Sequence, residues 1–149
     1  MSGAAQAGKG TIVENFGKYF AALGRILLAL IFVRAGINKL GSIDATAAEM
    51  AKGGIPLSNI LVYGAILMEL GVGLLLMVGL FARCAALALF FYTLVLALIF
   101  HAYWAAPAAQ TRLQASIFFA HLSMMGGMLM VVAFGAGALS LDAMLRRRS

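Results

Sequence analysis

The sequence is poor in charged residues, histidine and cysteine, and each shortage excludes a class of protein. Only 11% of the 149 residues are charged, whereas soluble globular domains average about 25%. The 2 histidines and 1 cysteine give a metal site few ligands to draw on. Because Cys84 is alone, the chain cannot form an internal disulfide, and thiol chemistry would need a partner protein.

Apolar residues, by contrast, make up 64% of the chain and gather in four long runs. A helix needs about 20 apolar residues to cross the hydrocarbon core of a bilayer. We therefore expect four transmembrane spans, at residues 20–40, 57–80, 84–104 and 115–134. The predicted fold is all-α, an antiparallel four-helix transmembrane bundle, and these spans leave no room for a soluble catalytic domain.

The segments around the spans are expected to be short. Residues 1–10 predict a mobile tail, residues 11–145 a single membrane domain, and residues 146–149 a basic tail. The T-I-V-E sequence at Thr11 to Glu14 matches a capping box, which favours a short interfacial helix before the first span. Between the first two spans, residues 45–52 predict a small helix on the membrane surface, with Asp44 as its N-cap.

The net charge of +6 is explained by topology rather than by nucleic-acid binding, because most of the basic residues stand singly at the ends of spans. With both termini in the cytoplasm, seven basic residues lie inside: Lys9, Lys18, Arg25, Arg83, Arg146, Arg147 and Arg148. Three lie outside: Lys39, Lys52 and Arg112. We expect the bilayer to be a partner, with the three C-terminal arginines anchoring to lipid headgroups, and we expect no nucleic acid.

Glu69 is an acid near the middle of the second apolar run, Ile60 to Leu80. A charge at the bilayer centre costs about 2.5 to 3.5 kcal/mol on insertion scales, so it needs a partner. If both spans end at the same level, Arg25 matches its depth best, and the small residues Ala65 and Gly73 would let the helices approach. Two interpretations stay open: a carboxylate that accepts protons or binds a ligand, or a structural Arg25–Glu69 pair that fixes helix register.

A second polar layer is expected toward the outer ends of the spans. Its residues are Arg34, Asn38, Lys39, His101, Trp104 and His121. We expect no metal or haem here, since only two histidines are present and no cysteine lies near them. Among cofactors, a quinone fits best, because its carbonyl oxygens need donors and its ring and tail suit aromatic and methionine walls. The alternative is that these side chains belong to an ordinary core, and no catalytic residue can be named.

Five segments of the chain together resemble the DoxX family of four-helix inner-membrane proteins, in the order in which that family has them. They are GRILLALIFVRAGINKL (Gly24–Leu40), KGGIPL (Lys52–Leu57), MELGVGLLLMVGLFAR (Met68–Arg83), FHAYW (Phe100–Trp104) and GAGALSLD (Gly135–Asp142). The resemblance implies characteristic polar or aromatic positions at Arg25, Lys39, Glu69, His101, Trp104 and Asp142. One departure is that Ala120 and His121 stand where many members have Lys-Asn, so His121 replaces the Asn as a hydrogen-bonding group.

The resemblance also implies a range of functions. Some relatives are subunits of thiosulfate:quinone oxidoreductase, and others are associated with membrane redox complexes that handle oxidative or thiol stress. We therefore expect a membrane subunit of a quinone-linked redox complex in a bacterial inner membrane, acting with a protein partner or as a homo-oligomer. A non-enzymatic membrane scaffold is the alternative, and a small-solute or proton carrier is less favoured because four helices leave little room for a pathway. Whether the chain is itself an enzyme stays open.

Overall fold

The computed structural model describes the backbone of residues 3–147 and the side chains of residues 16–147. It is 84% helical, and the described residues contain no strand, which confirms the all-α prediction. Its helices are α1 (Gly3–Leu40), α2 (Ile43–Lys52), α3 (Ser58–Ile66), η1 (Leu67–Val72), α4 (Gly73–Val78), α5 (Ala82–Phe100), η2 (Tyr103–Ala105), α6 (Ala108–Phe134) and α7 (Leu141–Arg146).

Four of the helical stretches are long and apolar enough to cross a membrane, as expected. They are Phe16–Leu40, Ser58–Val78, Ala82–Ala105 and Ala108–Phe134. The fourth begins seven residues before its expected start at residue 115, since Ala108 directly follows the helix-starting Pro107.

The N-terminal part of the chain differs from the expectation. Residues 3–10, predicted to be a mobile tail, and the Thr11–Glu14 segment, predicted to begin a separate interfacial helix, both lie inside the continuous helix α1. Residues 1 and 2 lie outside the described residues, as do 148 and 149 of the basic C-terminal tail.

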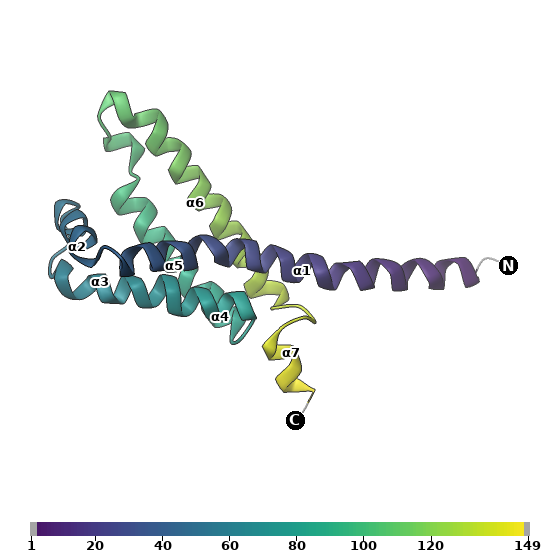
Figure 1. Cartoon of the computed structure of the whole chain (residues 1–149). Coiled ribbons are helices and arrows are strands. Elements are labelled where there is room, and N and C mark those ends of the chain that lie inside the picture. The colour runs from purple at the N-terminus through teal and green to yellow at the C-terminus, as the bar shows by residue number, and fades with distance from the viewer. Residues whose placement is uncertain (1–2, 148–149) are drawn as a thin grey trace.

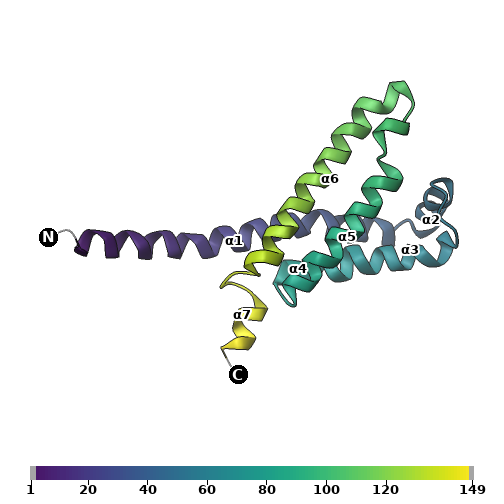
Figure 2. The same ribbon diagram turned by 180° about the vertical axis from the view of Figure 1, so that it is seen from behind.

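The spans form two antiparallel hairpins that meet at one end and separate at the other. In the first, α1 packs along α3, η1 and α4; in the second, α5 packs along α6. The hairpins are joined by the tight turn after α4, where Gly79 and Phe81 both have positive φ. From there α5 and α6 diverge from α1 and α3 (Figures 1 and 2). We call the joined end the α7 end and the separated end the α2 end.

Two glycines set the register between α1 and the second span. A methyl group at Gly36 would lie 2.7 Å from both the Cβ and the backbone nitrogen of Leu70, so the helices touch backbone to backbone there. One turn along, a methyl group at Gly73 would lie 3.2 Å from Phe32. Such close contact between helices is what small residues permit in a membrane.

The interior of the molecule is built from small side chains. Ala29, Ala85 and Ala86 are buried with Phe32, Leu76, Leu89 and Met128 where the two hairpins meet. A second cluster at the α2 end joins Ala47 of α2 to Val62 and Ile66 of α3. It holds the surface helix α2 against the end of the second span. The residue before α2 is Ser42, with no side-chain capping bond, so the expected Asp44 cap is wrong by two positions.

Candidate functional site

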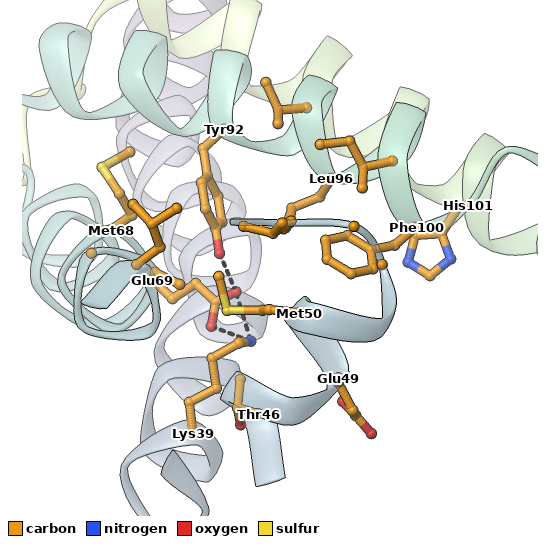
Figure 3. A pocket seen from close by; sticks show the side chains of 18 of the residues that line it. Lys39, Thr46, Glu49, Met50, Met68, Glu69, Tyr92, Leu96, Phe100 and His101 are labelled. Carbon is orange, nitrogen blue, oxygen red and sulfur yellow. Dashed lines mark hydrogen bonds and ion pairs between the residues drawn. The ribbon is translucent and has the colours of Figure 1, made fainter. Parts of the chain in front are cut away.

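Glu69 lies at the centre of a buried polar cluster with Lys39 and Tyr92. The Lys39 Nζ is 2.8 Å from Oε1 and 2.7 Å from Oε2 of the Glu69 carboxylate. The Tyr92 hydroxyl, from α5, donates a hydrogen bond of 2.8 Å to the same Oε1. Glu69 itself is only 3% exposed. Three chain segments, from α1, η1 and α5, therefore meet at one carboxylate (Figure 3).

The backbone around Glu69 is a π-helix, Leu67–Val72, inserted in the second span. π-Helical turns are wider than α-helical ones and occur often at functional sites. The residues before and after it, Ile66 and Gly73, keep α-helical angles, so the distortion is confined to this segment. It turns Glu69 toward the space between the two hairpins, where Lys39 and Tyr92 reach it.

Arg25 lies in a different place, so the expected Arg25–Glu69 pair is wrong. Its guanidinium donates to the backbone carbonyl oxygens of Met77, Ala136 and Leu139, at the α7 end of the molecule. The acid whose charge acts on it is Asp142. Arg25 thus ties α1 to the end of α4 and to the segment that follows α6.

Asp142, on α7, makes a second connection at the same end of the molecule. Its carboxylate accepts hydrogen bonds from the backbone N–H groups of Phe81, at 2.8 Å, and Ala82, at 3.0 Å. These are free N–H groups at the start of α5, where a carboxylate is favoured. Arg25 and Asp142 therefore form a structural joint rather than a ligand site.

The register of the first hairpin explains the wrong pairing. The depth estimate assumed that Leu40 and Leu57 lie level, but Gly36 lies against Leu70. Because the two helices are antiparallel, this contact means that α1 reaches about nine residues farther along the second span than the estimate assumed. Lys39 is thereby brought near Glu69, and Arg25 is moved to the turn after α4.

A cavity of about 1070 Å³ opens beside the Glu69 cluster, between α2, α3 and α5. We call it the main cavity. Lys39, Glu69 and Tyr92 form its polar floor, while Glu49 of α2 and His101 lie farther along it (Figure 3). Most of the remaining wall is apolar: Met50, Ile55, Leu61, Met68, Val95, Leu96, Ile99 and Phe100. Such a combination, apolar walls around a few polar groups, is typical of sites for small organic ligands.

The two histidine rings pack against each other beside the cavity, with their planes inclined at 39°. Their ring centroids are 4.9 Å apart. His101 lines the cavity, and its Nδ1 is 2.8 Å from Oε1 of Gln114. The His121 Nδ1 is 2.8 Å from the carbonyl oxygen of Ile117, so it donates to the backbone of its own helix. Of the expected polar layer, His101 and Lys39 are therefore the members that line the cavity.

The other members of that layer lie elsewhere. Arg34 and Asn38 are exposed on α1 and are not part of the cavity lining. Trp104 is 60% exposed and packs on Tyr103 and Phe118 at the tip of the second hairpin. Over the part of the chain that the structure describes, no three metal-binding side chains come together.

Tyr92 is the site residue that sequence reasoning missed. It stands in the middle of the third apolar run, where its hydroxyl group has no water to bond. A buried tyrosine hydroxyl usually finds a protein partner, and an acid at similar depth on the neighbouring span was the obvious candidate. The sequence alone therefore contained a reason to expect a hydrogen bond between Tyr92 and Glu69.

Comparison with known proteins gives a consistent assignment. The DoxX family matches residues 20–102. The chain is 33% identical over 120 residues to the inner membrane protein YphA of Escherichia coli (strain K12), covering 80% of this chain and 86% of the relative. It is 30% identical over 126 residues to the inner membrane protein YqjF of the same organism, covering 85% and 92%. No solved structure matches the chain significantly.

Proposed function

This chain is a member of the DoxX family of integral membrane proteins, and from that premise we propose that it is a membrane subunit of a quinone-linked redox complex. In this proposal it lies in the bacterial inner membrane, where the quinone pool is, and the main cavity receives the quinone ring. We propose that the α7 end is cytoplasmic, because seven basic residues belong to that side of the spans in the sequence.

The observation that carries the proposal is the polar floor of an otherwise apolar cavity. A lysine ammonium has three N–H donors, and the contacts of Lys39 to Glu69 employ two. The third can donate to a quinone carbonyl. The Tyr92 hydroxyl donates to Glu69, which leaves its oxygen lone pairs to accept from a quinol hydroxyl. The floor thus offers one donor and one acceptor, which suits both the oxidised and the reduced ring.

The charges of the cavity-lining side chains favour a ligand with a neutral headgroup over one with an anionic headgroup. The side chains that line the cavity include one cation, Lys39, and two carboxylates, Glu49 and Glu69. The balance is one negative charge, which repels a phosphate or carboxylate headgroup. A benzoquinone or naphthoquinone ring carries no charge and needs only hydrogen-bonding partners.

The redox step requires a second protein. Reduction of a quinone to a quinol takes two electrons and two protons, and the electrons would come from a thiol or a reduced sulfur compound that a partner protein oxidises. In this arrangement the described chain binds and orients the quinone. The Lys39–Glu69–Tyr92 cluster keeps the ring near the middle of the bilayer, since Glu69 lies about 16 Å along the span from Ser58.

Saturable binding of a quinone analogue tests the proposal. The full chain, reconstituted in liposomes, should be labelled by a photoreactive azidoquinone in competition with decylubiquinone, with adducts on main-cavity residues. Tyr92→Phe should weaken competition by the reduced form, decylubiquinol, by roughly three- to tenfold, because it removes the oxygen that accepts from the quinol hydroxyl. Trp104→Phe, at an exposed position outside the cavity lining, is the matched control and should bind normally.

Two results would contradict the proposal. If labelling does not saturate, or if Tyr92→Phe binds decylubiquinol as well as the wild type does, the main cavity is not a quinone site and the proposal fails.

The exposure of α6 supports the scaffold alternative. Only 11% of its membrane-spanning window is buried within the chain, against 28% for each of the other three spans. A partner helix could therefore cover α6 and use this protein as an assembly subunit. Crosslinking from Phe119 or Met130, both exposed on α6, should then recover one defined partner, and Glu69→Gln should affect only assembly.

A further inference from the structure

Helix α2 and the segment 53–56 form a partial roof over the main cavity at the α2 end. The roof is tight against α5, because a methyl group at Gly53 would lie only 2.8 Å from the Phe100 ring. It is also fastened to α3, through the buried contacts of Ala47 with Val62 and Ile66. These contacts narrow the cavity at this end.

The cavity is open, by contrast, along the gap between α3 and α5. Leu61 on α3 is 45% exposed, and Val95 and Ile99 on α5 are 52% and 45% exposed, although all three line the cavity. Gly64, one turn along α3 from Leu61, also lines the cavity and has no side chain; a methyl group there would meet no other atom within 4 Å. The gap is thus lined by apolar groups and left open at Gly64.

The position of this gap in the bilayer decides what can use it. Gly64 lies six residues from Ser58, the first residue of the span, or about 9 Å along the helix. That depth is inside the hydrocarbon core, which is about 30 Å thick. The polar floor at Glu69 lies about 7 Å farther along the same helix. A molecule at the gap is therefore surrounded by lipid tails, and its polar head can bond to the floor.

We infer that the main cavity is loaded sideways from the bilayer, through the gap between α3 and α5 that Gly64 keeps clear, and that its ligand is a neutral ring on a long apolar tail. This inference rests on the proposed function for the identity of the ring. The ring bonds to Lys39, and in its reduced form also to Tyr92, while the tail leaves past Gly64 into the lipid.

Filling the gap should discriminate between tailed and tail-less ligands. In proteoliposomes, Gly64→Trp should weaken the binding of decylubiquinone about tenfold or more, which corresponds to about 1.4 kcal/mol. Binding of the same ring without a tail should change less than about threefold, because the floor lies beyond the tryptophan. Gly64→Ala should bind as the wild type does. Gly126→Trp, at an equally open glycine on α6, is the matched control and should change the binding of neither ligand.

Two results would overturn the inference while the wild type still binds quinone. One is undiminished binding of decylubiquinone by Gly64→Trp. The other is an equal loss for tailed and tail-less rings, which would mean that the tryptophan fills the head site. If the wild type binds neither ring, the proposed function fails, and a measurement without any quinone decides the inference.

That measurement is the accessibility of a spin label inside the cavity. With the single native cysteine replaced, as Cys84→Ser, a label is placed at Met68 through Met68→Cys. Lateral access predicts faster collision with lipid-dissolved oxygen than with a water-soluble nickel complex. The same label at exposed Ala51 on α2, through Ala51→Cys, should show the opposite preference. Preference for the nickel complex at position 68 would show that the cavity opens to water, and the inference would be wrong.

Discussion

At the scale of single residues, Glu69 shows how a carboxylate is kept inside a bilayer. Its two oxygens receive two contacts from Lys39 and one from Tyr92, so both its charge and its lone pairs are matched. Only one member of the pair is fully enclosed: the Lys39 side chain is 26% exposed, whereas that of Glu69 is 4% exposed. Glu69 therefore depends on Lys39 more than Lys39 depends on Glu69.

This asymmetry predicts that removing the lysine is costly. Lys39→Met leaves the Glu69 carboxylate buried without a counter-charge, and truncating one partner of a fully buried pair costs about 3 to 5 kcal/mol. Since Lys39 is partly exposed, we expect a smaller loss of unfolding free energy, about 2 to 3 kcal/mol. Thermal unfolding in detergent measures it as a clear fall in the melting temperature.

The double variant Lys39→Met, Glu69→Gln is the control for that loss. It removes both charges, so stability should recover most of the way toward the wild type. If Lys39→Met alone is as stable as the wild type, the ion pair is not what holds Glu69 in the membrane.

At the scale of helices, two close contacts fix how α1 lies on the second span. Gly36 against Leu70 and Gly73 against Phe32 leave no room for another methyl group between the backbones. The position of Lys39 opposite Glu69 follows from these contacts, because Lys39 lies one turn beyond Gly36. The register of α1 is thus a condition for the polar floor.

Gly36→Ala should therefore disturb both stability and the floor. The new methyl group would lie 2.7 Å from the Leu70 backbone nitrogen, which forces the helices apart and costs about 1 to 3 kcal/mol. The displacement should also weaken quinone-analogue labelling, because Lys39 moves with α1.

Gly24→Ala is the matched control on the same helix. A methyl group there meets nothing within 4 Å, and alanine favours helix over glycine by up to about 1 kcal/mol. Stability should be equal or higher. A similar loss in both variants would mean that the contact at Gly36 is not the cause.

The same helices show what the sequence could and could not predict. The four spans were predictable because each is an apolar run of membrane-crossing length, a local property. The partner of Glu69 was not, because it depends on which of many glycines touches the neighbouring helix. The depth estimate had no means to distinguish Gly36 from Gly24, and it placed Arg25, rather than Lys39, beside Glu69. The π-helix at Leu67–Val72 had no evident sequence signal either.

At the scale of the whole molecule, the proposed orientation can be tested with the one native cysteine. Cys84 is exposed and lies at the α7 end, at the start of α5. If this end is cytoplasmic, a membrane-impermeant maleimide should label Cys84 in inverted membrane vesicles but not in intact spheroplasts. Cys84→Ser should remove the labelling.

The opposite pattern, labelling in spheroplasts alone, would place the α7 end outside. An added cysteine at exposed Ala51 on α2, in the Cys84→Ser background, should give the mirror-image result and serves as the internal check.

The contacts at the α7 end also fix the angle between the two hairpins. Arg25 and Asp142 hold the two hairpins together beside Ser140, while the hairpins stand apart where α2 covers the cavity (Figure 1). A small change of angle between the hairpins at this joint would move Phe100 much farther than Ala82, and would therefore change the width of the main cavity at the α2 end.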